Sequence, residues 1–372
     1  MHLTLHLTNK CNLNCKYCFV PHGSESMTRE TAFAAVDFSI EKGKPSGLLF
    51  YGGEPLLEKE LIYDIVDYSK KINAKTGHIF HYKMTTNGTL LDEEFLKFSN
   101  DINMTIGLSH DGYAQNDCRL TNNGNATFDL LEEKIPLLLK YHPYSAALCV
   151  MDPTTVHNAS STVQFLFDKG FRYISLNLNY SKTASWTKKH LAVLEEEYKK
   201  LAKMYVKWTK AEEKFYLSSF DMKILSHLKG EKYNADRRFM SREQPSVAPN
   251  GRLYSGSKHI DNPIFEIGDV FSGIDTQKRS LIDKIGGIPQ APCAACAIQN
   301  RCNYVYDSLV STETGIVSEI SPVQCANEQM VTPIADKIAE QLYRERNALF
   351  IHKHYNEMYS VVSLIEDKSI TG

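Results

Sequence analysis

The stretch Cys11-Asn12-Leu13-Asn14-Cys15-Lys16-Tyr17-Cys18 decides how this chain of 372 residues is interpreted. Its cysteines are spaced by four and three residues, so one short loop is able to wrap three thiolates around an iron–sulfur cubane. Such a cluster has four irons, and three thiolates leave one iron open to another ligand. The alternative for cysteines at this spacing is a zinc knuckle or a disulfide.

Short apolar runs alternate with helical periodicity in the first half of the chain. The predicted strands are 3–8, 47–51, 79–85, 104–109, 146–151 and 173–178. Six βα units in series predict an α/β fold, in which right-handed crossovers curl a parallel sheet into a partial (β/α)6 barrel. Functional sites of such folds lie at the C-terminal ends of the strands, and the cysteine loop directly follows the first strand.

The helices between these strands carry recognisable stripes and end signals. Phe33, Val36 and Ile40 are predicted to share one buried helix face. Asp92 is predicted to cap a helix at its N-terminus, and Gly170 to end the helix that begins near residue 159.

The second half of the chain divides into three segments with different sequence patterns. Residues 181–235 are predicted to be a helical connector, in which the stripe Leu194, Tyr198, Leu201, Tyr205 and Trp208 forms a buried helix face. Residues 236–330 are irregular, rich in turn residues and contain the last four cysteines. We expect a barrel over 1–180 and a helical tail over 331–372, with its helix from Thr332 to about 347.

Composition excludes several classes of protein. A net charge of −2 gives no basic excess, so a nucleic-acid partner is not expected. Neither a membrane span nor a secretory signal is present in the sequence, which predicts a soluble, cytoplasmic protein without a membrane partner. Seven of the nine cysteines fall into two groups at metal-ligand spacing, and this use of cysteine suits a reducing compartment.

The cysteine loop resembles the signature of radical S-adenosylmethionine (radical SAM) enzymes, and this resemblance covers roughly the first 180 residues. It implies a 4Fe-4S cluster on Cys11, Cys15 and Cys18, whose open iron chelates the amino and carboxylate groups of S-adenosyl-L-methionine. It also implies reductive cleavage of SAM to a 5′-deoxyadenosyl radical, which abstracts hydrogen from the substrate.

The same resemblance implies contacts with SAM in the first half of the chain. Tyr17 would lie near the adenine. In Gly52-Gly53-Glu54-Pro55, the glycines let the backbone approach a ligand, and Glu54 would accept a hydrogen bond from the SAM ammonium group. The alternative interpretation of this motif is a turn between a strand and a helix.

A further segment, Ser109-His110-Asp111-Gly112, resembles the Ser-x-Asp-Gly segment of the branch that modifies peptides and proteins. The resemblance implies that Ser109 contacts SAM, with turn formation as the alternative. Arg119 would meet the SAM carboxylate, or else be a structural arginine. His110 would either pack at the rim or contact substrate, while Cys118 and Cys149 fit no ligand spacing.

The second cysteine group is Cys293, Cys296, Cys302 and Cys325. Its spacing resembles the second auxiliary cluster of SPASM domains, which are C-terminal extensions of radical SAM enzymes that modify peptides and proteins. A complete SPASM domain holds another cluster, but residues 250–256 contain no cysteine and Tyr306 occupies a further expected ligand position. We therefore expect a SPASM-like domain with one auxiliary 4Fe-4S cluster, for electron transfer or folding, or a zinc site with the same four ligands.

The resemblance implies a radical SAM maturase that installs a thioether or carbon–carbon crosslink in a ribosomally made peptide. Alternatives are formylglycine formation like that of sulfatase maturases, or peptide epimerisation. From another class, the chain could be a SAM- or zinc-binding partner module without catalysis. The intact set of Cys11, Cys15, Cys18 and Glu54 argues against that module.

The expected partners follow from this chemistry. They are a peptide or small protein substrate and an external flavodoxin- or ferredoxin-like electron donor. Because the chain starts on its first strand, the peptide-recognition domain that many such enzymes carry is expected to be either absent or provided by a separate peptide-recognition protein. Asn177, Asn179 and Tyr180 lie at the end of the sixth strand and either face the substrate or serve the turn. No residue is singled out as a catalytic acid or base.

Overall fold

The structure, a computed structural model, describes residues 1–181, 183–229, 244–286, 291–302, 321–359 and 362–363. The strands are β1 (His2–His6), β2 (Leu13–Cys15), β3 (Ser46–Tyr51), β4 (Phe80–Thr86), β5 (Thr105–Ser109), β6 (Arg119–Thr121), β7 (Ala146–Met151), β8 (Tyr173–Leu178), β9 (Tyr216–Leu217), β10 (Ser246–Val247), β11 (Arg252–Tyr254), β12 (Glu266–Asp269) and β13 (Gly273–Ile274). The α-helices are α1 (Arg29–Ser39), α2 (Lys59–Thr76), α3 (Glu93–Asp101), α4 (Gln115–Cys118), α5 (Phe128–Tyr141), α6 (Ala159–Asp168), α7 (Lys188–Lys210), α8 (Ser218–Lys229), α11 (Thr276–Gly286), α12 (Ala291–Ala294), α14 (Pro322–Arg344) and α15 (Ala348–Tyr355).

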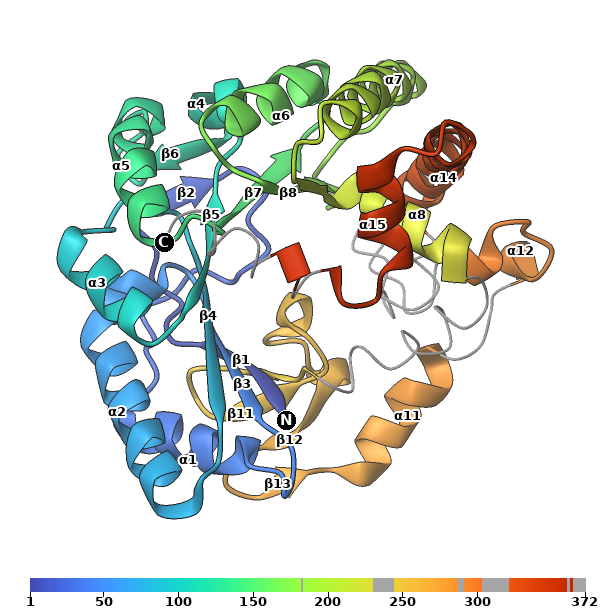
Figure 1. Ribbon diagram of the computed structural model, residues 1–372. Helices are drawn as coiled ribbons and strands as arrows, with labels where there is room; N and C mark the ends of the chain where they lie inside the picture. Colours follow the sequence, from blue (N-terminus) through green and yellow to red (C-terminus); the bar gives the residue numbers. More distant parts are fainter. Residues whose placement is uncertain (182, 230–243, 287–290, 303–320, 360–361, 364–372) are drawn as a thin grey trace.

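A curved sheet forms the centre of the molecule, with most helices on its outer side (Figure 1). The strand order is β13-β12-β11-β10-β1-β3-β4-β5-β7-β8-β9. Neighbours from β10 to β9 are parallel, whereas β10 to β13 are joined by antiparallel pairs. The predicted α/β fold is confirmed, and all six predicted strands are present.

The parallel part of the sheet is wider than predicted. β9 extends it beyond β8, and β10 extends it beyond β1. Both strands have only two residues, which is too short for a periodic signal in the sequence. Through β10, the cysteine-rich C-terminal segment is hydrogen-bonded to the barrel sheet, and the division of the chain into four domains stays a prediction.

The two faces of the sheet have different roles because side chains alternate along a strand. On the helix side, Leu3, Leu5, Leu48 and Phe50 are buried in the main hydrophobic core. On the inner side, the last inward-facing residue of five successive strands lines a pocket; these residues are Tyr51, Thr85, Ser109, Val150 and Asn177. The pocket therefore lies at the C-terminal ends of the strands, as predicted.

Local signals at the helix ends are largely confirmed. The Asp92 side chain accepts a hydrogen bond from the Phe95 amide at 2.8 Å, and Gly170 follows α6 with φ of 105°. The expected face of α1 is wrong in two positions: Val36 is buried, but Phe33 is only half-buried and stacks on Tyr68. The helix ends at Ser39, so Ile40 does not join its buried face and is 39% exposed.

The long C-terminal helix α14 begins earlier than the sequence predicts. It starts at Pro322 instead of Thr332, because the Ser321 hydroxyl accepts a hydrogen bond from the Gln324 amide and proline suits the first helical position. As a result, Cys325 lies in the first turn of a helix.

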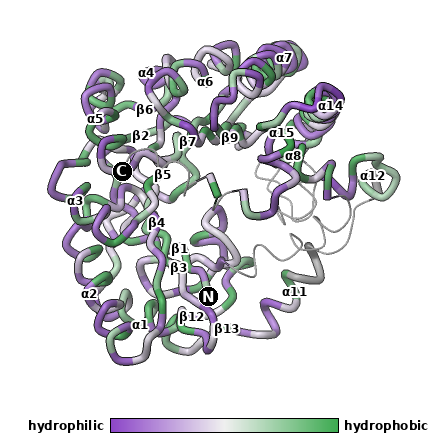
Figure 2. The backbone as a smooth tube through the Cα atoms, viewed as in Figure 1, coloured by the Kyte–Doolittle hydropathy of each residue, from purple (hydrophilic) through white to green (hydrophobic). Residues whose placement is uncertain are grey.

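The connector packs as its pattern predicts. The stripe of Leu194, Tyr198, Leu201, Tyr205 and Trp208 is buried along α7. Hydrophilic and hydrophobic residues alternate along the outer helices, as expected for helices that cover a core on one side (Figure 2). Within the described residues, no helix is both long and apolar enough to cross a membrane.

Candidate active site

The cysteine loop follows β1 and is held against the chain segment after β5. Within the loop, β2 pairs with β6, and this register sets Cys15 opposite Arg119. The Lys16 amide donates to the Cys118 carbonyl at 3.0 Å, and the Cys18 amide donates to the Cys15 carbonyl at 3.1 Å. The hydrogen bond between Cys18 and Cys15 closes a tight turn, which brings the second and third cysteines of the motif close together.

The three thiols are free and line one pocket. Burial is the main reason that the pKa of the Cys11 thiol rises to about 11, and the proximity of Cys15 and Cys18 adds to the rise. An iron–sulfur cluster would displace these thiol protons. Among the residues that the structure describes, no three His, Cys, Asp or Glu side chains converge on a site for a single ion. A cubane does not need such convergence, because each thiolate binds a different iron.

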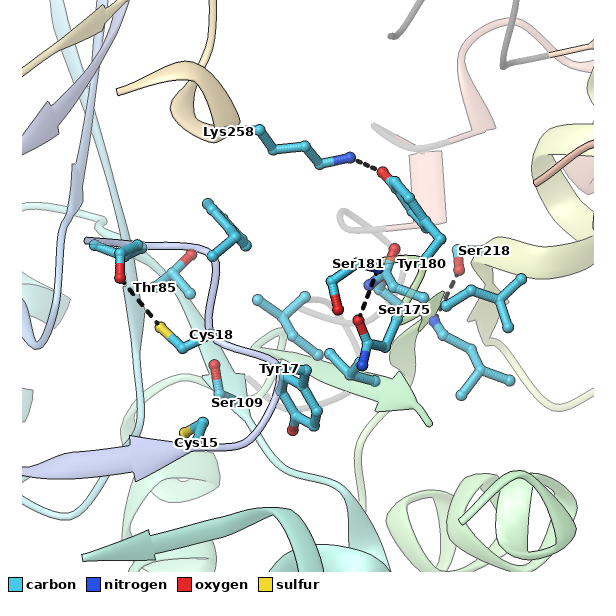
Figure 3. Close-up of a pocket in the computed structure, with 18 of the residues that line it drawn as sticks. Cys15, Tyr17, Cys18, Thr85, Ser109, Ser175, Tyr180, Ser181, Ser218 and Lys258 are labelled. Carbon is cyan, nitrogen blue, oxygen red and sulfur yellow. Dashed lines mark hydrogen bonds between the residues drawn. The ribbon is translucent and has the colours of Figure 1, made fainter. Parts of the chain in front are cut away.

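The pocket has a volume of about 570 Å³ and runs from the cysteine loop to helices α8 and α14. Cys15, Tyr17, Cys18 and Ser109 lie toward one end, whereas Tyr180 and Ser218 lie toward the other (Figure 3). This volume suits a cofactor together with part of a substrate.

The Gly52-Gly53 pair lines the pocket at the end of β3. A Cβ atom on Gly52, whose φ is 134°, would lie 2.4 Å from the Thr8 carbonyl oxygen. On Gly53, a Cβ atom would lie 2.0 Å from the Lys10 carbonyl oxygen. Only glycines permit the cysteine loop to approach the β3 end so closely.

Glu54 does not face the pocket. Its fully buried carboxylate accepts hydrogen bonds from the Thr86 hydroxyl at 2.7 Å, the Asn87 amide at 2.8 Å and the Leu56 amide at 3.1 Å. Burial raises the pKa of Glu54 to about 7. The side chain thus ties the end of β3 to the end of β4 and caps the short helical turn Pro55–Glu58. Of the residues Gly52, Gly53 and Glu54, only the two glycines line the pocket.

Tyr17, Ser109 and Arg119 all line the pocket, but Arg119 has a partner that the sequence analysis missed. The Asp111 carboxylate, 2% exposed, pairs with the Arg119 Nε at 2.9 Å. It also accepts hydrogen bonds from the Tyr17 hydroxyl and the Val150 amide. The available signal was an acidic residue two positions after a strand and eight positions before an arginine.

His110 and the two isolated cysteines lie outside the pocket lining. His110 is fully buried, its Nδ1 accepts a hydrogen bond from the Gly112 amide at 2.9 Å, and its ring packs near Phe165. Of the two roles considered for His110, packing and substrate contact, these contacts fit packing. Cys118 and Cys149 are each 1% exposed, as expected for small core residues.

The residues at the end of β8 divide between the two predicted roles. Asn177, Asn179 and Tyr180 all line the pocket. The Asn179 side chain also holds the turn, because it donates to Asp152 at 2.9 Å and accepts from the Ser181 amide at 3.1 Å. The Tyr180 hydroxyl accepts a hydrogen bond from Lys258, which reaches across the pocket (Figure 3).

The far wall of the pocket contains a buried ion pair that the sequence analysis also missed. Lys223 of α8 pairs with Glu328 of α14, and both side chains line the pocket. The Lys223 Nζ also contacts the Arg301 carbonyl at 3.4 Å. Near this pair, the Tyr198 hydroxyl donates to the Asn327 side chain at 2.6 Å. No short-range pattern links residues from separate helices, so the sequence held no signal for this wall.

The second cysteine group lies directly behind that wall. Cys302 follows Arg301, whose side chain binds Asp336 of α14 at 2.8 Å. Burial raises the pKa of the Cys325 thiol, and the nearby Cys296 and Glu328 raise it further.

The other two cysteines of the group belong to a turn. The Cys296 amide donates to the Cys293 carbonyl at 3.0 Å, and the Gln329 side chain contacts the Cys296 sulfur at 3.2 Å. The position of Tyr306, where another cysteine was expected, lies outside the described residues.

Comparisons with known sequences agree with the arrangement of the barrel. The family model of the radical SAM superfamily matches residues 5–166. The chain is 33% identical over 205 residues to the uncharacterized protein MJ0907 of Methanocaldococcus jannaschii, covering 54% of this chain and 69% of the relative. It is 29% identical over 176 residues to the cysteine-type anaerobic sulfatase-maturating enzyme of Clostridium perfringens, covering 44% of this chain and 47% of that enzyme. The chain thus spans about half the length of that enzyme.

Comparisons with solved structures extend the likeness of the fold to most of the chain. The structure of native anSMEcpe with bound AdoMet and Cp18Cys peptide aligns with a TM-score of 0.78 at 19% identity, covering 93% of this chain and 99% of that one. Streptococcus suis SuiB bound to its precursor peptide SuiA aligns with a TM-score of 0.59 at 14% identity, covering 82% and 72%. At these identities the likeness shows a shared fold.

Proposed function

We infer, from the premise that this chain belongs to the radical SAM superfamily, that it is a maturase which crosslinks residues within a ribosomally made peptide. The family fixes the class of chemistry, whereas the peptide substrate and the crosslink are our proposal. The proposal includes an external flavodoxin- or ferredoxin-like electron donor.

The residues present suit the cofactors of this family. Cys11, Cys15 and Cys18 would hold one 4Fe-4S cluster, because all three thiols open into a single pocket. The backbone of Gly52 and Gly53, together with Tyr17, Ser109 and Arg119, would bind SAM in the same pocket. When bound, these cofactors supply a radical that removes a hydrogen atom from the substrate.

One observation carries the proposal of a net oxidation. The Lys223–Glu328 pair lines the pocket, while Lys223 also contacts the residue before Cys302 and Glu328 lies three positions after Cys325. An electron acceptor on the second cysteine group would therefore adjoin the substrate end of the pocket. A crosslink requires the substrate to lose two hydrogen atoms, one as an atom and one as a proton and an electron, so an adjoining acceptor supports it.

Peptide crosslinking has one well-supported competitor. The similarity to a cysteine-type sulfatase-maturating enzyme favours formylglycine formation, which is also a net oxidation. The fold likeness to anSMEcpe over 93% of this chain is compatible with either reaction. We favour crosslinking because residues 250–256 lack the ligand that the complete two-cluster pattern would place there.

The test is a mass spectrum of a candidate peptide after anaerobic co-expression of this chain with each short reading frame that flanks its gene. A crosslink predicts a loss of about 2 Da per event, with fragments that map to two joined residues. Formylglycine instead predicts an aldehyde that reacts with a hydrazide probe. Deuterium incorporation at one Cα in heavy water, without a mass change in ordinary water, would identify an epimerase.

The role of the second cysteine group is tested in the same assay. Replacing Cys293 and Cys296 by serine should abolish the crosslink while SAM cleavage to 5′-deoxyadenosine continues. Cys149→Ser is the matched control, because Cys149 is a buried core cysteine outside both groups. An unchanged crosslink yield in the folded double variant would refute a role for this group as electron acceptor.

A further inference from the structure

Asp111 lies at the centre of the polar contacts beside the cysteine loop, and the proposed function leaves its role open. Its carboxylate accepts hydrogen bonds from three separate segments of the chain. The donors are the Tyr17 hydroxyl in the cysteine loop, the Arg119 guanidinium in β6 and the Val150 amide in β7, the last at 2.9 Å. A carboxylate with only 2% exposure and this set of donors is held in a single orientation.

Arg119 is fixed by Asp111 through two of its three nitrogens. The Nε lies 2.9 Å and the Nη2 3.4 Å from the carboxylate oxygens of Asp111. The third nitrogen, Nη1, lies 4.0 Å from the sulfur of Cys15, and the guanidinium stands 5.1 Å from the centre of the Tyr17 ring. Because the guanidinium is planar and rigid, its two-point attachment to Asp111 determines the direction of Nη1.

The charges of this pair act on the sulfur in opposite directions. Positive charge and hydrogen-bond donors near a cluster thiolate stabilise the reduced cluster, which carries more negative charge, and so raise its reduction potential. The Arg119 guanidinium has this effect on Cys15, whereas the Asp111 carboxylate opposes it. The two side chains are buried together, so their effects are screened little by solvent.

We propose that Asp111 is a positioning residue that aims Arg119 at the Cys15 sulfur and balances its charge, and thereby sets the reduction potential of the cluster on this loop. The inference rests on the proposed function in one respect, since it requires that cluster. It makes a prediction that a purely structural role does not share. Removing the negative charge and removing the positive charge must move the potential in opposite directions.

The experiment is an anaerobic redox titration of the full-length chain after cluster reconstitution, followed by electron paramagnetic resonance. The signal of the SAM-binding cluster is recognised by its change when SAM is added. Asp111→Asn should raise the midpoint potential and Arg119→Gln should lower it. We expect each shift to reflect about a tenfold change in the redox equilibrium, which corresponds to about 59 mV for one electron.

Asp221→Asn is the matched control. Asp221 is also a buried aspartate, paired with Lys353 at 2.6 Å, but it does not line the pocket. The Asp221→Asn variant should have a lower free energy of unfolding and an unchanged midpoint potential of the cluster. Shifts of Asp111→Asn and Arg119→Gln in the same direction, or no shift in either, would overturn the inference.

A second measurement covers variants that fail to bind iron. In the cluster-free chain, alkylation of Cys15 by iodoacetamide should be severalfold faster in Asp111→Asn and severalfold slower in Arg119→Gln than in the unmodified sequence. Equal rates would count against the inference. Failure of the unmodified chain to bind iron and to cleave SAM would refute the proposed function instead, so the two failures are distinguishable.

Discussion

Two buried carboxylates hold the ends of neighbouring strands around the cysteine loop, and each does so with hydrogen bonds from several elements. Glu54 joins the β3 end to Thr86 and Asn87 at the β4 end. Asp111 joins the β5 end to the cysteine loop and β7. The sequence analysis assigned Glu54 to the SAM ammonium group and gave Asp111 no role, whereas the structure shows both acids holding the framework of the site.

The closest backbone approach at the site gives the first prediction. Gly53→Ala should abolish SAM binding, because its Cβ would lie 2.0 Å from the Lys10 carbonyl oxygen and force the cysteine loop away from β3. Isothermal titration of the reconstituted protein with SAM measures the effect. Gly23→Ala is the control, since the nearest atom to its Cβ lies at an ordinary 3.5 Å. Normal SAM affinity in Gly53→Ala would show that the loop can move aside.

At the scale of elements, the sequence predicted those parts of the site that depend on local order. The six central strands and the cap at Asp92 follow from periodicity and from side-chain chemistry within a few residues. The pocket wall at Lys223 and Glu328 could not be predicted, because it depends on how α8 and α14 pack together. The early start of α14 was predictable in principle from Ser321 and Pro322.

The pairing of α8 with α14 gives the second prediction. Lys223→Met should lower the free energy of unfolding by about 3–5 kcal/mol, because it breaks the buried ion pair of Lys223 with Glu328. The double variant Lys223→Met/Glu328→Leu should recover most of this loss. Urea unfolding of all three proteins provides the measurement, and an equal loss in the single and double variants would contradict the ion-pair explanation.

At the scale of the whole molecule, the buried side chains of His6, His110 and His354 make the free energy of unfolding depend on pH. Burial lowers the pKa of His6 to about 3, of His110 to about 4 and of His354 to about 4. In the unfolded chain these rings bind protons below about pH 6.5. Between pH 6.5 and 4 the unfolded state therefore binds more protons than the folded state, and stability is lost as the pH falls.

This linkage gives the third prediction. The free energy of unfolding should be nearly constant with respect to these groups above pH 6.5 and should fall between pH 6.5 and 4. Each histidine should contribute at most about 3 kcal/mol to the decrease. His354→Gln keeps a polar side chain beside Asp221 and should remove one such contribution. Urea unfolding at several pH values measures the slope, and an unchanged slope in His354→Gln would refute this assignment.

The pairing of β1 with β10 also has a consequence for biosynthesis. Thr4 lies opposite Ser246, so the strand that precedes the cysteine loop acquires one of its neighbours only after two thirds of the chain has left the ribosome. Until then β1 presents an open edge, and contacts of such long sequence separation form slowly. Iron–sulfur assembly on the nascent chain would meet a loop whose barrel is unfinished. Completion of the sheet beside the cysteine loop must therefore await the C-terminal third of the protein.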